Sequence, residues 1–487
     1  MVLYQWSSII VIIVWLLISY VYGFLKTRRG KRSVEEWFVA GRRLGLIVLW
    51  LSLGANIYSS YTFLGLPGLA ACKGFEAFTI ILYGMIGYLL GFWLIPLFWR
   101  EARDRKWLTI ADAFQDLYNS RIMGIYIALT TSLWSIPYIQ LQLQGMGYII
   151  ETSSYGLIKQ EIAVISSFIV LTILIVFGGM ISVTSINALQ GALMLLSIWL
   201  LGLIAPLILF GNYTELFNTL INASKINPDF HIIPSREDYL FLYTTILAAP
   251  LGFWLWPNRL HNIFAARDEK IVKKNMVLTS IFQLSQFPAV IVGLTATGLF
   301  IRGELASSLS EFRKIADKSF MEVAIRVFNN PLLIGLIGAG ALAASLSTAA
   351  AILHTCASLF SKNIAANKSS EEKIMLYARL FTVIIGIISL LLALYSPGVL
   401  VYLLLIGYAG IIQLFPIYIV KLKKPEFINT QIAIISSATG MITALVFNIT
   451  KPFPYIYDGF IGLLLNLTVM SIGIFIKYFK QLRVKNK

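Results

Sequence analysis

The sequence has little charge and few of the side chains that most enzymes use. Of its 487 residues, 13% are charged and three are histidine, whereas a soluble protein carries about 25% charged residues. The two cysteines, Cys72 and Cys356, lie in or at the ends of different apolar stretches, so neither a disulfide framework nor a metal-binding pair is expected. His231 falls in a predicted loop, and His261 and His354 have no carboxylate at metal-ligand spacing. These absences argue against a membrane-embedded enzyme.

The sequence also lacks a polar stretch long enough for a sizeable soluble domain. Its hydrophobic share is 58% and its mean hydropathy +0.79. Runs of roughly 20 apolar residues, enough to cross a hydrocarbon core of about 30 Å, recur along the chain. We therefore predict an all-α polytopic membrane protein with a single transmembrane domain over residues 1–487. The thirteen predicted spans are 7–25, 45–71, 75–99, 122–150, 160–178, 184–211, 239–266, 276–301, 331–360, 374–395, 398–420, 430–449 and 459–478.

The first of these spans is expected to be retained, because residues 7–25 have no basic segment before them and no small-residue cleavage site after them. The net charge of +16 comes from basic residues in short loops. They are not gathered on one face with aromatic residues between them, so nucleic acid is not an expected partner.

The basic loops instead predict an orientation in the membrane. Breaks at 26–44, 100–106, 267–274 and 421–424 and the C-terminal segment are rich in lysine and arginine, which is typical of cytoplasmic loops. The intervening breaks carry acidic residues and Asn-x-Ser/Thr sequons, which fit an external face. The loop 302–330 carries both acidic and basic residues, so it supports this orientation less than the other loops do. We predict a plasma-membrane protein with its N-terminus outside and its C-terminus in the cytoplasm.

Two predicted spans are interrupted by glycine and proline. Span 45–71 contains Pro67, and span 239–266 contains Pro250 and Pro257. Their starts are five spans apart, so the two spans run in opposite directions. Paired interrupted spans of this kind indicate a transporter site near the middle of the membrane, although glycine and proline are also common in ordinary membrane helices.

A pair of adjacent hydroxyls lies in the apolar stretch ALAASLSTAAAILHTCASLF. Ser347 and Thr348 offer oxygen donors, and the carbonyl of Ala344 lies one turn earlier on the same face. With carbonyls freed by the break in span 45–71, they would form a four- or five-oxygen site for sodium. The alternative is that both hydroxyls bond to the preceding turn and serve only helix packing.

Six stretches in order resemble the sodium:solute symporter family: EEWFVAGRRLG, SSYTFLGLPG, PYIQLQLQGMGY, FGGMISVTSINALQ, FAARDEK and ALAASLSTAAAILHTCASLF. The resemblance implies a leucine-transporter-type core of two inverted five-helix repeats. These repeats would be 45–211 and 239–420, with the extra helix 7–25 before them and two C-terminal helices in 430–478.

The resemblance also implies a single sodium ion. Its ligands would be Ala55, Tyr58, Ala344, Ser347 and Thr348. If the alignment is instead made on the ANI segment, residues 55–57, the two ligands in span 45–71 become Gly54 and Ile57 in place of Ala55 and Tyr58. A second sodium site is not expected, because Asn187 stands where many members have an aspartate, and Ala350 and Ala351 replace the hydroxyls that would assist it.

The solute is expected to bind beside the break. Tyr61 and Thr62 stand where sugar-transporting relatives carry acidic and amide side chains, which argues against sugars. The stretch PYIQLQL resembles the monocarboxylate-transporting branch, and backbone N–H groups at a broken helix would favour an anion. The predicted substrate-binding residues are Ser59, Ser60, Tyr61, Thr62, Gln140, Gln144 and Trp254.

Together these features predict a sodium-coupled symporter that imports a small organic solute by alternating access, with a monocarboxylate as the first choice. A proline-like amino acid and pantothenate are the alternatives within the class, and a membrane enzyme or sensor is the alternative outside it. For Arg259, His261 and His354 we favour a structural role over a proton relay. Arg259 has the further alternative of steering an anion.

Overall fold

The computed structural model describes residues 2–27, 33–365 and 370–485, and this part of the chain is almost entirely helical. The longer helices are α1 (Val2–Thr27), α5 (Glu76–Asp104), α7 (Arg121–Ser153), α8 (Gln160–Phe210), α13 (Glu269–Leu284), α14 (Gln286–Ile301), α17 (Pro331–Leu359), α18 (Glu371–Tyr395), α21 (Thr430–Thr450) and α22 (Asp458–Lys485). Medium-length helices are α3 (Leu46–Ile57), α11 (Arg236–Gly252), α19 (Leu400–Ile411) and α20 (Leu414–Lys423). Short helices are α2 (Val34–Val39), η1 (Ala40–Arg42), η2 (Tyr61–Gly65), α4 (Leu66–Lys73), α6 (Ile110–Tyr118), α9 (Tyr213–Leu220), α10 (Ala223–Ile226), α12 (Pro257–Phe264), α15 (Leu309–Ile315), η3 (Ala316–Lys318), α16 (Ser319–Val327) and η4 (Phe360–Ala365).

The apolar helices follow the order of the predicted spans. In the described residues, ten are long and apolar enough to cross a membrane, two more spans are bent pairs, and a shorter apolar helix covers Gln160–Val176. The break predicted between residues 178 and 184 is not a break in helical structure, because α8 continues through it. No proline precedes Pro206 in α8, so nothing in that segment removes a helical hydrogen bond.

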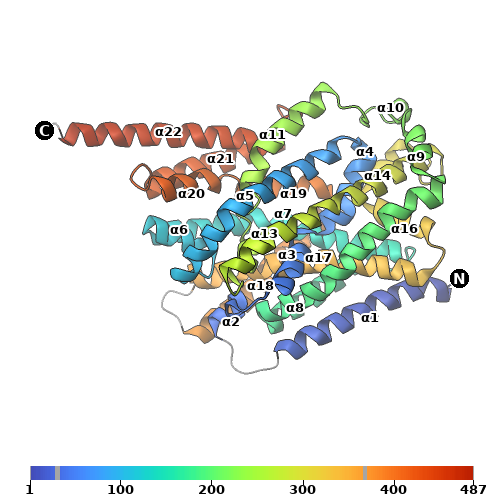
Figure 1. Cartoon of the computed structure of the whole chain (residues 1–487), viewed down its shortest axis with the longest axis horizontal. Helices are drawn as coiled ribbons and strands as arrows, with labels where there is room; N and C mark the ends of the chain where they lie inside the picture. Colours follow the sequence, from blue (N-terminus) through green and yellow to red (C-terminus); the bar gives the residue numbers. More distant parts are fainter. Residues whose placement is uncertain (1, 28–32, 366–369, 486–487) are drawn as a thin grey trace.

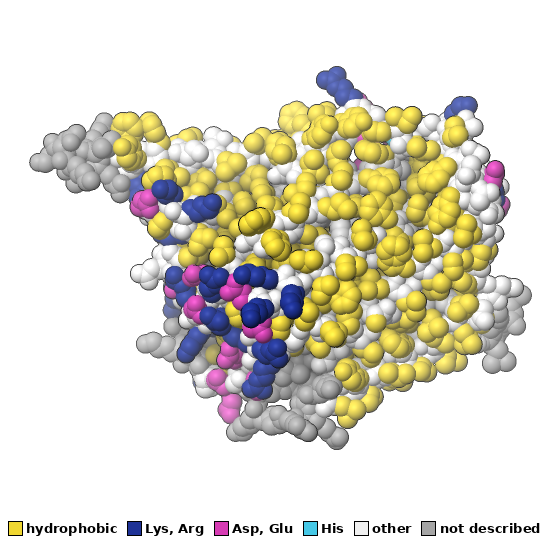
Figure 2. Space-filling model, viewed as in Figure 1, with side chains coloured by type: hydrophobic (Ala, Val, Ile, Leu, Met, Phe, Trp, Pro, Cys, Tyr) yellow, Lys and Arg dark blue, Asp and Glu magenta, His cyan; other side chains and the backbone are white. Residues whose placement is uncertain are grey.

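The helices lie side by side in an inclined bundle (Figure 1). Helix α1 starts at one end of the bundle and α22 finishes beyond the opposite end. Figure 2 shows a broad hydrophobic face, with lysine and arginine side chains crowded at one end. Ion pairs join Arg100 to Glu269 and Arg105 to Asp116, within and beside the predicted basic breaks.

Helix α17 forms the centre of the bundle. Nearly all of its residues from Ile334 to Leu359 are buried, and it packs against α1, α3, α7, α8 and α18. Small residues allow this crowding, because a side chain would collide with a neighbour at several positions. A Cβ at Gly335 would lie 2.8 Å from the carbonyl oxygen of Ser8, and a Cβ at Gly340 would lie 2.2 Å from Ser197 Oγ.

Two spans are broken where the sequence places its breakers. Helix α3 is followed by η2 and α4 at an angle of 55°, and α11 is followed by α12 at 41°. At the first break the backbone of Tyr58 is extended (φ −89°, ψ 113°), and Ser59 starts the next helix by accepting a hydrogen bond from the Tyr61 N–H (3.1 Å). At the second break Pro257 occupies the first turn of α12, where its missing N–H is not needed.

Candidate functional site

The hydroxyl pair of α17 faces the first break. Ser347 Oγ donates to the carbonyl oxygen of Ala55 (2.7 Å) and lies 3.0 Å from that of Ala344. Thr348 Oγ1 lies 3.3 Å from the carbonyl oxygens of both Ala55 and Asn56. Four of the five predicted sodium ligands therefore meet, although Ser347 is 292 residues from Ala55 in the chain.

The carbonyl of Ala55 is one of those that the break leaves without a helical partner. In a continuous helix the N–H four residues later would bond to it, but in the described chain the Ser59 N–H makes no such bond. The carbonyl of Gly54, in contrast, accepts from the Tyr58 N–H at 2.9 Å. The geometry therefore favours the alignment that selects Ala55 over the one that selects Gly54. Tyr58 lies in the break itself, but its carbonyl makes no contact with the hydroxyl pair in the described residues.

A ladder of amide side chains joins the two broken spans, and sequence reasoning missed it. Asn258 Nδ2 donates to Asn56 Oδ1 (2.6 Å), and Asn56 Nδ2 donates to the carbonyl of Asn258 (3.2 Å). One turn away, Ser52 Oγ donates to Asn262 Oδ1 (2.9 Å). The only signal in the sequence is the i, i+4 spacing of Ser52 and Asn56 on the first broken span and of Asn258 and Asn262 on the second. Movement of α3 relative to α12 would have to break this ladder.

The predicted residue Ser60 ties three helices together at the break. Its N–H donates to Gln142 Oε1 (2.9 Å) on α7, and its Oγ lies 2.6 Å from Ser345 Oγ on α17. Beside it, Ser59 Oγ accepts from Tyr138 OH (3.3 Å). Gln142 and Ser345 were not among the predicted residues.

The remaining predicted substrate residues divide into two groups. Tyr61 and Thr62 are buried in the bent span, and their hydroxyls have no partner in the described residues. Gln140 instead donates to the carbonyl of Ser396 (2.7 Å), and its Nε2 lies 3.5 Å from Gln144 Oε1. Trp254 points to α5, where its Nε1 donates to the carbonyl of Gly87 (2.7 Å). The structure thus brings Ser59, Ser60, Tyr61 and Thr62 together, but not Gln140 or Trp254.

An aromatic cluster lies between the second break and α19. Trp256 packs edge-on against Tyr138 and Tyr408, at ring-centroid distances of 5.0 and 5.3 Å. Arg259 Nη1 donates to Tyr408 OH (3.0 Å) and to the carbonyl of Phe253 (2.5 Å). Such rings can shape a site for a small solute, because they present rigid surfaces with few polar atoms.

No conventional metal site is present in the described chain, where no three His, Cys, Asp or Glu side chains gather. The oxygens around Ser347 are neutral, which suits a weakly held monovalent cation that must dissociate in each cycle. Asn187 is buried with an unpartnered Nδ2 in the described structure. Ala350 and Ala351 carry no hydroxyl, so a second sodium site remains unexpected.

Polar residues continue along α17 from the hydroxyl pair toward its C-terminal end. Thr355 lies seven residues after Thr348 and contacts His261 Nδ1 (3.2 Å). His354 packs on the ring of Trp37 with centroids 4.2 Å apart, and Ser358 donates to the carbonyl of His354 (2.9 Å). In the described residues the histidine ion pair is that of His231 with Asp238, and the structural role of His261 and His354 stays a prediction.

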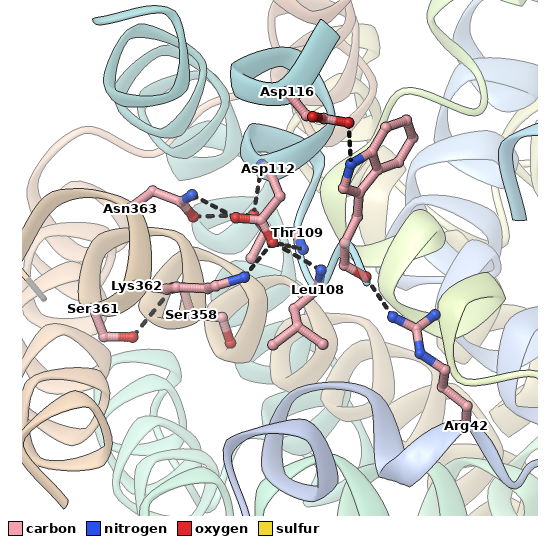
Figure 3. A network of polar contacts seen from close by, with 10 residues as sticks. Arg42, Leu108, Thr109, Asp112, Asp116, Ser358, Ser361, Lys362 and Asn363 are labelled. Carbon is pink, nitrogen blue, oxygen red and sulfur yellow. Dashed lines mark hydrogen bonds and ion pairs between the residues drawn. The ribbon is translucent and has the colours of Figure 1, made fainter. Parts of the chain in front are cut away.

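A charged network, the α6 latch, closes this end of α17 (Figure 3). We define it as Thr109 and Asp112 of α6 with Lys362 and Asn363 of η4. The Asp112 carboxylate accepts from Lys362 Nζ and from Asn363 Nδ2 (2.8 Å), and Thr109 Oγ1 donates to Asn363 Oδ1 (3.0 Å). Beside the latch, Arg42 donates to the carbonyl of Trp107 (2.6 Å).

The charge of Asp112 is stabilised by these partners. Burial by itself would raise its pKa, but the positive charge of Lys362 and hydrogen bonds from Lys362, Asn363 and the Leu108 N–H outweigh burial and lower the pKa below its ordinary value. Asp112 is therefore a carboxylate at neutral pH, and the α6 latch is an ion pair.

Three comparisons place this geometry among known proteins. The chain is 30% identical over 481 residues, covering 95% of it and 96% of the relative, to the uncharacterized symporter YhjB of Bacillus subtilis. It is 25% identical over 282 residues, 57% of each chain, to a monocarboxylate transport permease protein of Rhizobium johnstonii. A solved structure of a Na+-coupled sialic acid symporter in a substrate-bound outward-open state has the same fold, with a TM-score of 0.77, 18% identity and coverage of 96% of this chain and 98% of that one.

The family model of the sodium:solute symporters matches residues 37–420, which include both broken spans and the whole of α17. That match agrees with the six stretches found in the sequence and with a fold of helices in which two bent spans meet. The protein is a multi-pass membrane transporter and not an enzyme. The chain belongs to the sodium:solute symporter family.

Proposed function

We propose that this protein is a secondary active symporter that imports one small monocarboxylate with one sodium ion. Sodium binds between α3 and α17, at the carbonyls of Ala55 and Ala344 and the hydroxyls of Ser347 and Thr348, with Tyr58 as the fifth ligand. The carbonyl of Ala55 carries this proposal, because it has lost its helical partner and faces two hydroxyls. A carbonyl and two hydroxyls make a hard, uncharged oxygen site.

Coupling follows from the position of this site. Sodium would hold the first broken span against α17, while Ser59 and Ser60 hold the same span against α7. An ion that orders the break therefore also orders the residues proposed to contact the solute. Alternating access would then be a rocking of the broken spans, with the amide ladder and the α6 latch as the contacts that must open.

A monocarboxylate is proposed as the solute for two reasons. A monocarboxylate permease is among the relatives. The proposed contact residues carry hydroxyl and amide groups and no carboxylate that would repel an anion. A sugar is not proposed as the solute, because Tyr61 and Thr62 stand where sugar-transporting relatives carry acidic and amide side chains.

The orientation remains the one that the basic loops predict. The α6 latch and the crowded lysine and arginine side chains of Figure 2 would face the cytoplasm, together with the C-terminus. The loop that contains η3 would face outside, with the N-terminus.

Uptake into proteoliposomes tests the proposal directly. Purified protein is given labelled lactate, pyruvate, acetate, proline or pantothenate, each with and without an inward sodium gradient. We expect sodium-dependent accumulation of at least one of the three acids. Accumulation of proline or pantothenate alone would show that the substrate is that compound and not a monocarboxylate. Uptake that does not depend on sodium would refute the coupling.

The sodium site is tested with the double substitution Ser347→Ala and Thr348→Ala. Losing two charge-assisted oxygen contacts is expected to raise the half-saturating sodium concentration by roughly 10- to 100-fold. Ser358→Ala is the matched control, because that buried hydroxyl lies on the same helix and bonds only to the preceding turn. Unchanged sodium dependence in the double variant would assign the pair to helix packing.

A further inference from the structure

Arg259 is a cation in the interior of the protein. It lies in the first turn of α12, directly after the second break, and only 2% of its surface is exposed. Among the side chains that the structure describes, it is the one buried lysine or arginine. A position in the membrane interior makes this exceptional, because ionisable residues there are costly and usually belong to a substrate or ion pathway.

The partners of Arg259 are all uncharged. Its Nη1 donates to the carbonyl of Phe253 and to Tyr408 OH, and its guanidinium lies 4.2 Å from the centroid of the Phe253 ring. The carbonyl of Phe253 is available because it lies at the break.

No carboxylate neutralises this charge in the described part of the chain. The two acidic side chains with the least exposed surface are elsewhere and already paired, Asp238 with His231 (2.8 Å) and Asp458 with Lys451 (2.6 Å). Asp112 and Asp317 are likewise bonded elsewhere, to Lys362 and to the Leu400 N–H. The core around the second break therefore keeps one uncompensated positive charge. Carbonyl dipoles and aromatic faces offset part of the cost of burying it, but an anion would offset much more.

The guanidinium has hydrogen-bonding capacity left for such an anion. It carries five N–H donors in a planar fork, and its Nε has no partner in the described residues. A planar fork of this kind matches the two oxygens of a carboxylate better than any other side chain does.

Arg259 is also connected to the first break. Tyr408, which it contacts, packs on Trp256 at 5.3 Å, and Trp256 packs on Tyr138 at 5.0 Å. Tyr138 OH in turn donates to Ser59 Oγ (3.3 Å). The uncompensated charge thus lies across one layer of aromatic rings from the residues proposed to hold the solute.

We propose that Arg259 is the carboxylate-binding residue of the transporter and forms a bidentate ion pair with the transported monocarboxylate. This inference rests on the proposed function and assigns the group that makes it selective for anions. Small acids are preferred over amino acids, because the ammonium group of a zwitterion has no buried carboxylate to meet in the described core. The aromatic layer of Trp256, Tyr138 and Tyr408 limits the size of the acid.

The substitution Arg259→Gln tests the assignment in proteoliposomes. We expect the KM for the transported acid to rise by roughly 10- to 100-fold, as for loss of charge-assisted hydrogen bonds. Sodium binding without solute, followed by tryptophan fluorescence, should survive. Arg267→Gln is the matched control, since Arg267 is exposed and pairs only with its neighbour Asp268. An unchanged KM in a variant that still binds sodium would overturn the inference and leave the proposed function standing.

A second measurement needs no variant and covers the case in which Arg259→Gln fails to fold. Wild-type protein is treated with phenylglyoxal, an arginine-specific reagent, and modification of Arg259 is followed by peptide mass spectrometry. Saturating lactate with sodium should slow this modification, while modification of Arg267 stays constant. Equal rates at Arg259 with and without the acid would refute the assignment. If wild-type protein takes up no monocarboxylate at all, the proposed function itself fails.

Discussion

At the scale of single residues, the first break depends on the close approach of α7. Gly145 lies against Ser60, and a Cβ added at Gly145 would be 2.3 Å from Ser60 Oγ and 2.5 Å from its Cβ. The glycine therefore allows Ser60 to reach Gln142 and Ser345 at the same time.

We expect Gly145→Ala to impair transport without unfolding the protein. Overpacking a close-packed contact costs about 1–3 kcal/mol, and that strain falls on the residue that positions the break. The initial rate of solute uptake should drop by roughly tenfold. Gly45→Ala is the control, because a Cβ there meets nothing within 4 Å. A wild-type rate in Gly145→Ala would show that Ser60 does not need its present position.

At the scale of helices, the α6 latch holds α6 to the end of α17. Its central ion pair joins residues that are 250 positions apart, and one carboxylate receives both Lys362 and Asn363. A contact that pairs a short connecting helix with the end of the central helix is suited to open and close during the transport cycle.

Removing the charge of Asp112 should loosen this end of the bundle. In Asp112→Asn we expect faster labelling of Cys356, which is buried on α17, by a membrane-permeant maleimide in a Cys72→Ser background. Lys362 loses its ionic partner, so the open arrangement becomes more populated. Asp104→Asn serves as the control, because Asp104 is 55% exposed and pairs only with its neighbour Arg103. Equal labelling rates in Asp112→Asn and the control would show that the latch does not gate access.

A second carboxylate connects three elements at the other end of the bundle. Asp317 in η3 accepts a hydrogen bond from the Leu400 N–H (3.1 Å) at the start of α19. Its Oδ1 also lies 2.6 Å from where a Cβ on Gly68 of α4 would be. Burial raises the pKa of Asp317 to about 7, although the Leu400 N–H acts in the opposite direction.

This raised pKa predicts a stability that depends on pH. Because the folded protein holds the proton more tightly than the unfolded chain, the contribution of Asp317 is complete below its unfolded pKa of 3.8 and is lost as pH rises through about 7. The thermal unfolding temperature should therefore fall as pH rises from about 4 to about 7 in wild type and level off above that, with a smaller fall in Asp317→Asn. In Asp268→Asn the fall should equal that of wild type, because hydrogen bonds led by the Ile271 N–H lower the pKa of Asp268. Identical profiles in wild type and Asp317→Asn would contradict this prediction.

At the scale of the whole molecule, the proposed stoichiometry makes transport electrically neutral. One sodium ion and one monocarboxylate carry no net charge, and Arg259 stays in the protein. One net charge crossing 100 mV would be worth about 2.3 kcal/mol, or roughly a 50-fold change in accumulation.

We therefore expect the steady-state accumulation of the acid to be indifferent to an imposed potassium diffusion potential. Sodium activation of uptake should be hyperbolic, with a Hill coefficient near one. Voltage-dependent accumulation together with a sigmoidal sodium response would require a second sodium ion, and would direct attention to Asn187.

The sequence alone determined the class of protein, the order of its spans and the position of both breaks. Long apolar runs can be satisfied only by helices in a membrane, and Pro257, which has no N–H to donate, is favoured at the start of a helix and so marks the second break. The adjacent hydroxyls of Ser347 and Thr348 were visible because polar groups are rare in such a stretch. From the sequence, the carbonyl ligand in the first broken span could be assigned only to Ala55 or, in the other alignment, to Gly54. A shift of one residue does not change which residue types the span contains.

The tertiary structure decided which side chains meet. Gln140, Gln142 and Gln144 have fixed orientations relative to one another on α7, but their rotation toward the break is set by packing, and it is Gln142 that reaches Ser60. The residues of a broken segment follow no helical period, so the direction of Trp254 toward α5 could not be inferred. The burial of Arg259 without a carboxylate likewise depends on what the distant α19 brings to it. Periodicity orients residues within one helix, and only contacts between helices far apart in the chain decide what those residues face.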